Sequence, residues 1–125
     1  MHKLALLLFL SAIARPVLAE STEEMLSSCR RLAEANVANT EVELPQDFET
    51  GRCWGAFAVI QKVTALVIAP SKQPALLVCS PSESTRTQYI AIFVEYTKRN
   101  PRRLNEDFFF VALTALREAF PCGKP

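Results

Sequence analysis

The chain has 125 residues, and its 14 Lys and Arg residues nearly balance its 13 Asp and Glu residues, giving a net charge of +1. A nucleic-acid-binding domain usually carries a strong basic excess, so this composition argues against a nucleic acid as partner. The length fits a single domain, and a domain this small buries only a modest core, so covalent cross-links would help to stabilise it.

Residues 1–19 have the pattern of a secretory signal peptide. A short basic segment, residues 1–3, precedes an almost purely apolar run over residues 4–13, which is too short to span a bilayer. We expect cleavage after Ala19, leaving a mature domain of residues 20–125 with no later segment able to cross a membrane. An uncleaved anchor or a buried first helix is the alternative.

Cleavage would remove Lys3, Arg15 and His2, which is the only histidine. The mature chain would then carry 12 basic and 13 acidic residues, a net charge of −1. The export pattern predicts a location outside the cytoplasm, where disulfides can form.

The first predicted helix begins at Ser21, where Ser21 and Glu24 form an S-x-x-E capping box. One apolar stripe follows at helical spacing and fades near Asn36. Its members are Met25, Leu26, Cys29, Leu32 and Ala33.

The second predicted helix begins near Asp47, a good N-cap residue, and ends at Pro70. Its apolar residues, Val67 among them, cover more than one face, so we expect this helix to be central. Gly51 and Gly55 lie four residues apart, a spacing that would let another backbone approach closely. The alternative is that Gly51 lies in a frayed first turn.

Residues 75–78 are apolar and are expected to run extended against the core. The third predicted helix starts at Ser80 as N-cap, with Pro81 at its first position and Glu83 completing a capping box. It runs to about Arg99, before an Asn-Pro pair that ends it.

The fourth predicted helix opens at Asn105, has two acidic residues in its first turn, and ends at Pro121. No alternation of period two and no hairpin turn pair is evident, so we expect no sheet. The predicted fold class is all-α: a small four-helix bundle, with or without extra short helices.

Four cysteines remain after cleavage, and no two of them form a C-x-x-C pair. A four-thiolate zinc site usually has closely paired ligands, so two disulfides are favoured over a metal site or free thiols. If sequential helices are antiparallel neighbours, the residue before the third helix lies beside the residue after the fourth. Cys29 lies about as far before the end of the first predicted helix as Cys53 lies after the start of the second, so an antiparallel arrangement would also place these two side by side. We therefore predict the pairs Cys29–Cys53 and Cys79–Cys122.

The mature chain carries no set of residues typical of catalysis. Without histidine, Ser-His and Cys-His nucleophiles and His-ligated metals are excluded, and no phosphate-binding glycine loop is present. The carboxylate pairs Glu23-Glu24 and Glu106-Asp107 are explained by helix capping and the helix dipole. We predict no catalytic residue, no metal and no cofactor, and therefore a protein that is not an enzyme.

Three motifs occur in order along the chain. They are Gly51-Arg52-Cys53-Trp54-Gly55, then Cys79-Ser80-Pro81, then the A-L-x-x-A-F-P-C run over residues 115–122. Together they resemble the Rap/Tai family of type VI secretion immunity proteins, over about residues 25–122.

The resemblance implies a periplasmic, all-helical and often dimeric protein that binds and blocks a peptidoglycan amidase delivered by another cell. Such an inhibitor needs no catalytic residues of its own. The alternative is a small periplasmic helical chaperone or stress protein, and an enzyme comes third.

Two surface segments are candidates for contact with the partner. The first is the proline-stiffened connection that carries Ser71, Lys72 and Gln73. The second is the basic turn between the last two helices, which carries Arg99, Arg102 and Arg103. The alternative for the second segment is a solvated turn in which bases follow a helix C-terminus.

Overall fold

The computed structural model describes residues 20–37 and 46–123, so the expected signal peptide lies outside the described residues. The described chain is mainly helical, which confirms the all-α prediction. No helix in it is long and apolar enough to cross a membrane. The elements are α2 (Thr22–Val37), α3 (Phe48–Thr64), β1 (Val67–Ile68), β2 (Gln73–Pro74), α4 (Arg86–Arg99), the 3-10 turn η2 (Pro101–Arg103) and α5 (Phe108–Ala119).

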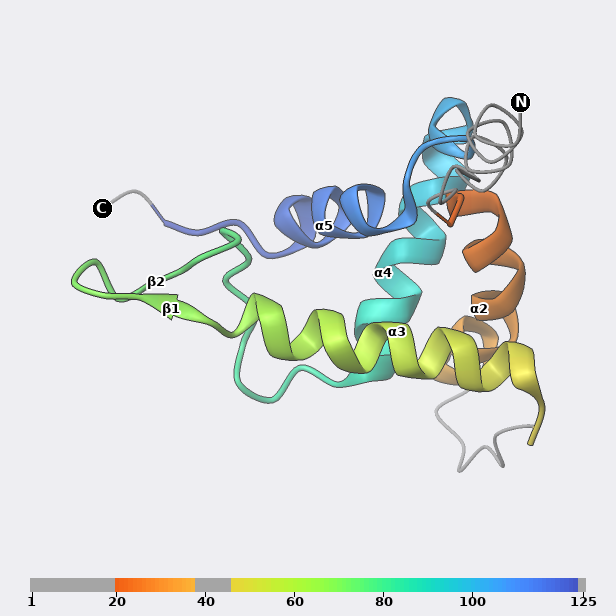
Figure 1. The fold of residues 1–125 in the computed structure, drawn as a ribbon, viewed down its shortest axis with the longest axis horizontal. Helices are drawn as coiled ribbons and strands as arrows, with labels where there is room; N and C mark the ends of the chain where they lie inside the picture. The colour runs from red at the N-terminus through yellow and green to blue at the C-terminus, as the bar shows by residue number, and fades with distance from the viewer. Residues whose placement is uncertain (1–19, 38–45, 124–125) are drawn as a thin grey trace, which may run out of the picture.

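The helices are not stacked as antiparallel sequence neighbours. Figure 1 shows α3 and α5 lying crosswise to α2 and α4. α2 and α4 each pack against all three other helices, so this pair, and not the helix that follows Asp47, forms the centre. The predicted antiparallel order is wrong because the connections over residues 38–47, 65–85 and 100–107 are longer than those that force hairpin geometry.

Three phenylalanines from three helices meet at the middle of the core. Phe57 of α3 lies 5.6 Å, between ring centroids, from both Phe93 of α4 and Phe108 of α5, and the latter two are 5.3 Å apart. All three are buried, and Met25 and Leu32 of α2 belong to the same buried core. Tilted and edge-to-face pairs of this kind add to the stabilisation from burial alone. The cluster therefore explains why the helices converge at one point.

Both predicted disulfides are confirmed. Cys29–Cys53 joins α2 to α3, and both residues are fully buried within the core. Cys79–Cys122 joins the segment before α4 to the chain that follows α5, and both of its residues are half-buried. The described chain contains no free cysteine. The two cross-links thus fix one contact inside the core and one at its edge.

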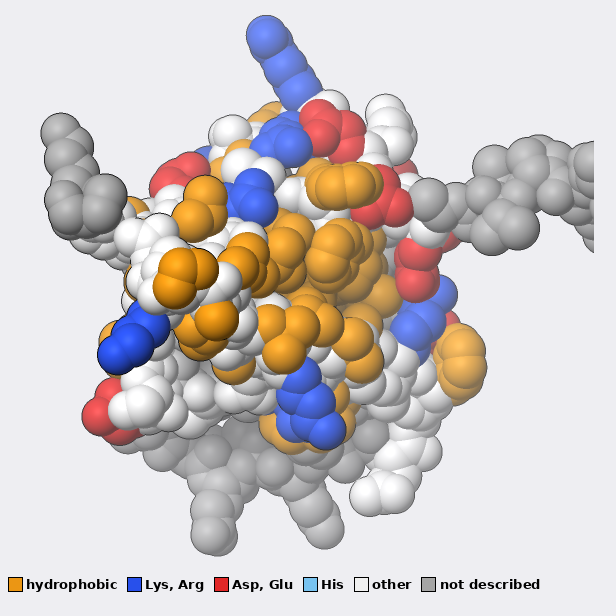
Figure 2. Space-filling view, turned by 60° about the vertical axis from the view of Figure 1, so that its left-hand side comes forward, with side chains coloured by type: hydrophobic (Ala, Val, Ile, Leu, Met, Phe, Trp, Pro, Cys, Tyr) orange, Lys and Arg blue, Asp and Glu red, His pale blue; other side chains and the backbone are white. Residues whose placement is uncertain are grey.

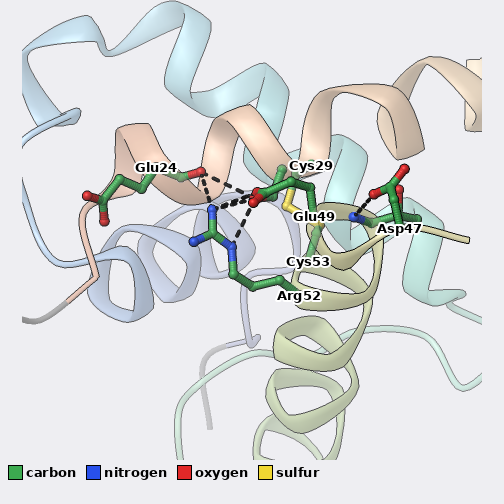
Figure 3. The surroundings of a disulfide bond; sticks show 8 residues. Glu24, Cys29, Asp47, Glu49, Arg52 and Cys53 are labelled. Atoms are coloured by element: carbon green, nitrogen blue, oxygen red, sulfur yellow. Dashed lines mark hydrogen bonds and ion pairs between the residues drawn. A yellow bond between two sulfur atoms is a disulfide. The ribbon is translucent and has the colours of Figure 1, made fainter. Parts of the chain in front are cut away.

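A polar network beside the first disulfide also holds α2 against α3 (Figure 3). Arg52 of α3 donates hydrogen bonds to the hydroxyl of Ser28 (2.6 Å) and to the backbone carbonyl of Glu24 (3.1 Å), both on α2. Its guanidinium also pairs with the carboxylates of Glu20 (2.8 Å) and Glu49 (2.9 Å). Arg52 is largely enclosed by these groups, which makes it part of the scaffold.

Two predicted helix starts hold and two move. The capping box of Ser21 and Glu24 is formed, and Asp47 caps α3 by accepting a hydrogen bond from the backbone of Thr50. The third helix begins at Arg86, not at Pro81, because Thr85 is its N-cap and forms a capping box with Gln88. The hydroxyl of Ser80 lies instead 2.5 Å from that of Tyr89.

The last helix starts at Phe108 rather than near Asn105. The 3-10 turn η2 occupies the connection, and Asp107 becomes the N-cap by accepting a hydrogen bond from the backbone of Phe110. The expected close backbone approach at Gly51 and Gly55 is also wrong. Apart from the neighbouring residues and the backbone of the same helix, no heavy atom of the described chain lies within 4 Å of the position a Cβ would take at either residue.

Candidate functional site

A short β-hairpin projects from the body of the protein where no sheet was expected. α3 ends at Thr64, six residues before Pro70, and β1 then pairs antiparallel with β2, with Val67 opposite Pro74. Figure 1 shows this hairpin extending beyond the helices at one end of the molecule. Of the predicted contact residues, Ser71 and Lys72 lie in the turn at its tip, and Gln73 begins β2 opposite Ile68.

The tip of the hairpin is held by its own hydrogen bonds. The backbone amide of Lys72 and the hydroxyl of Ser71 both donate to the carbonyl of Ile68, at 3.1 and 3.0 Å. Lys72 adopts a left-handed φ of 56°, which closes the turn. The tip therefore has a defined shape although it projects into solvent.

Large apolar side chains are exposed on the hairpin and beside it. Leu66, Val67, Ile68 and Leu77 are each 52 to 59% exposed. Figure 2, which looks toward this end, shows hydrophobic side chains gathered over it. The prediction that Leu66 to Ile68 extend a central helix is wrong because the helix stops early. Of the segment over residues 75–78, expected to lie against the core, only Val78 is fully buried.

The segment that carries Leu77 is bonded on one side to α5 and on the other to Phe120, the residue that follows α5. The side chain of Arg117 donates to the carbonyl of Leu76 at 2.8 Å, and the amide of Cys79 donates to the carbonyl of Phe120 at 2.9 Å. Leu77 has a φ of 55°, in the left-handed region that side-chain-bearing residues rarely adopt and that costs of order 1 kcal/mol or more. The anchored neighbours therefore hold a strained leucine in solvent.

The hairpin and the chain on either side of it carry basic but no acidic side chains. No Asp or Glu occurs between Glu49 and Glu83, whereas Lys62 and Lys72 fall in that stretch and both are exposed. Arg117 of α5 adds a third cation, bonded to a backbone carbonyl rather than to an acid. Within the described part of the chain, none of these three cations has an acidic group at ion-pair distance.

The basic turn is a different kind of surface. Arg103 pairs with Glu106 at 2.7 Å and donates to the Tyr96 hydroxyl at 2.7 Å, and Arg99 pairs with Glu118 at 3.1 Å. The hydrogen bond to Glu106 raises the pKa of Arg103, and the same bond lowers the pKa of Glu106.

Of the three arginines predicted to bind the partner, only Arg102 is free of an ion pair in the described chain. Figure 1 places the turn at the end of α4, away from the hairpin, so the structure does not bring the two predicted contact segments together.

The hollows on the described surface hold little that could perform chemistry. One of about 480 Å³ beside α4 contains a single ionisable side chain, Glu83. A groove of about 340 Å³ between α2 and α4 is lined by opposite charges, with Arg30 and Lys98 beside Glu34 and Glu95. No group of three potential metal ligands occurs among residues 20–37 and 46–123. The hairpin is therefore the feature whose chemistry is most distinctive.

One feature of the sequence does indicate this site: the long stretch without acidic residues between Glu49 and Glu83. The exposure of Leu66, Val67, Ile68 and Leu77 had no sequence signal, because apolar residues of this kind are usually buried.

Comparison with known proteins adds an independent finding. The family model described as Rap1a immunity proteins matches residues 21–122. No curated protein and no solved structure matches the chain.

Proposed function

Because this chain belongs to the family of Rap1a immunity proteins, we propose that it binds and inhibits a peptidoglycan amidase effector in the periplasm. Membership in the family implies an immunity protein that binds a secreted effector. The amidase target comes from the motif resemblance to the Rap/Tai proteins, in which the effectors cleave peptidoglycan. The protein would act as a stoichiometric inhibitor and not as a catalyst.

The observation that carries the proposal is a preformed projection on a cross-linked body. An inhibitor that blocks a cleft must place a segment in it without losing much conformational entropy on binding. The hairpin tip is held by internal hydrogen bonds, and the adjoining segment is tied by the Cys79–Cys122 disulfide to the chain that follows α5. This combination suits insertion into a partner.

The periplasm is supported by two features that fit together. Residues 1–19 have the pattern of a signal peptide, and the domain contains two disulfides, which persist in oxidising compartments and are rare in the cytosol. Peptidoglycan lies in the same compartment, so an exported inhibitor would meet an effector that attacks it. We propose the basic turn, through Arg102, as a secondary contact that steers association.

The test is inhibition of hydrolysis in solution. The chain is purified from the periplasm and titrated into peptidoglycan amidase effectors, including any encoded beside its gene, while the turbidity of purified sacculi is followed. We expect the activity of one effector to vanish near a one-to-one molar ratio. If no amidase is bound or inhibited, the proposed target is wrong.

A second measurement separates immunity from the chaperone alternative. The chain is mixed with a reduced, aggregating client protein at neutral and acidic pH, and light scattering is recorded. An immunity protein should leave aggregation of the client unchanged, whereas a chaperone should suppress it without selecting a partner.

The compartment is checked by expressing the chain with and without residues 1–19 in cells that export the amidase. Only the exported form should protect these cells from lysis.

A further inference from the structure

The structure assigns the effector-docking role to one surface, and the assignment rests on the proposed function. We name this surface the hairpin face and define it as Leu66, Val67, Ile68, Lys72 and Leu77. We propose that it docks into an apolar cleft of the effector whose edge carries acidic groups. The partner is thus an effector protein of defined surface chemistry: apolar at the centre of its cleft and negative around it.

The apolar character of the hairpin face is what requires a partner. Single exposed hydrophobic residues are normal on a protein surface, but grouped ones mark interaction sites. Leu66, Val67 and Ile68 are consecutive, so their side chains alternate between the two sides of the exposed ribbon, and a cleft that encloses the hairpin would contact both sides. The carbonyl of Leu66 accepts a hydrogen bond from the amide of Ala75, which brings the strand that leads to Leu77 alongside. Figure 2 shows the resulting hydrophobic area. Each of these four residues exposes more than half of its maximal surface to solvent, and docking could bury all of that exposed area.

The charge around the face indicates which partner it fits. Lys62, Lys72 and Arg117 form no ion pair within the described chain, and Glu118, the acid next to Arg117 in sequence, pairs with Arg99 instead. An isologous contact between two copies would bring these cations near their own counterparts, which opposes association. A partner with acidic groups at the edge of an apolar cleft would pair with them instead. Charge complementarity therefore selects a different protein over a second copy.

The backbone shows that the exposure is built into the fold. Leu77 is left-handed, and on either side of it Leu76 is bonded to Arg117 of α5 and Cys79 to Phe120, the C-cap residue of that helix. A leucine that is strained and exposed contributes little to folding, and strain of this kind is concentrated at functional sites. Docking would bury a side chain that is already in position, so its binding energy would not be spent on ordering the segment.

The experiment uses the effector that the wild-type chain is found to inhibit. Val67→Ser combined with Ile68→Ser removes apolar contact, and Lys72→Glu reverses a charge. Phe48→Ser is the matched apolar control, because Phe48 is 76% exposed at the opposite end of α3, about 25 Å away for a helix of 17 residues. Arg30→Glu on α2 is the matched charge control. Circular dichroism and thermal melts confirm that each variant folds.

We expect the double serine variant to raise the Kd at least about 100-fold, as loss of central contacts does. Lys72→Glu should slow association about tenfold at low salt and reduce its salt dependence. Both controls should bind within about twofold of wild type. If the hairpin variants bind and inhibit as the controls do, the docking surface lies elsewhere and the proposed function survives.

Three other outcomes overturn the assignment in different ways. If the wild-type chain inhibits no amidase, the proposed function fails and the docking proposal fails with it. If sedimentation shows a dimer that only the hairpin variants dissociate, the face belongs to a second copy. If the chain binds phosphatidylglycerol vesicles and the double serine variant does not, the face belongs to a membrane surface.

Discussion

Removing the two disulfides one at a time should show whether chain entropy or core packing dominates their contribution to stability. The perturbations are Cys29→Ala with Cys53→Ala, and Cys79→Ala with Cys122→Ala. The cross-linked residues are 24 apart in the first pair and 43 apart in the second. In the chain-entropy model these separations correspond to about 3.5 and about 4 kcal/mol at 25 °C. Entropy alone would therefore make the second disulfide slightly the more stabilising.

Burial reverses this order. Cys29 and Cys53 are 0% exposed and belong to the hydrophobic core, whereas Cys79 and Cys122 are half-buried. Replacing both core cysteines by alanine removes two buried sulfur atoms and leaves a void, which adds about 2 kcal/mol. We expect losses of about 5.5 kcal/mol for the first double variant and about 4 kcal/mol for the second.

Urea unfolding followed by far-ultraviolet circular dichroism would measure both free energies of unfolding against the oxidised wild type. A larger loss for the Cys79 and Cys122 variant would refute the reasoning. The void left by the two core cysteines would then be too small to outweigh the greater loop entropy of the second disulfide. Binding supplies a second comparison. The variant without Cys79 and Cys122 should weaken effector binding more, because that disulfide is one of the links that hold the segment around Leu77 in place.

Three further changes test the fold in detail. Thr85→Ala should lower the free energy of unfolding by about 1 kcal/mol and Ser82→Ala by much less, in urea melts, because Thr85 caps α4; equal losses would place the helix start earlier. Gly55→Ala should raise it by roughly 0.5 to 1 kcal/mol, since the added methyl meets no atom within 4 Å; a lower melting temperature would contradict this. Glu106→Gln should flatten the acid side of the stability curve. Arg103 holds the pKa of Glu106 below its usual value of 4.5, so its stabilisation is present above that pH and is lost as pH falls through the folded-state pKa. Unchanged melts between about pH 3 and pH 6 would show that the ion pair is not coupled to folding.

Sequence reasoning predicted the parts of the fold that depend on local chemistry. The capping box at Ser21 and the N-cap at Asp47 are both formed, because each requires only a side chain within three residues of its partner. The disulfide pairing was also predictable, although the antiparallel order behind it is wrong. Cys29 lies where α2 meets α3, and that meeting point exists whether the helices cross or align.

The helix starts that moved illustrate competition between two local solutions. Ser80-Pro81 is a good start for a helix, yet the Ser80 hydroxyl bonds to Tyr89 and the amide of Cys79 bonds to α5. These long-range contacts hold the chain out of helical conformation until Thr85. The residue types between positions 80 and 85 do not indicate these contacts, so the later start of α4 could not be predicted from that segment alone.

The hairpin face was beyond prediction for a related reason. Leu66 to Ile68 continue the apolar pattern of α3, and burial is the usual outcome for such residues. Their exposure becomes apparent only when the core is seen to be filled without them, by Phe57, Phe93 and Phe108. Residues Ser71 to Gln73 were predicted as a contact segment because the prolines on each side limit their conformations. These prolines are visible in the sequence, so this part of the site could be predicted.

The positions of the family motifs suggest how fold and partner choice are separated in this chain. The motif at residues 51–55 supplies a core cysteine and Arg52, and the motif at residues 79–81 supplies the cysteine that anchors the chain to α5. The hairpin face lies entirely between these two motifs and contributes no residue to the core cluster. Substitutions there would alter the shape and charge offered to an effector while leaving the cross-links and the aromatic centre intact. A chain organised in this way can acquire a new partner at little cost in stability, because the residues that fold it and those proposed to bind are different residues.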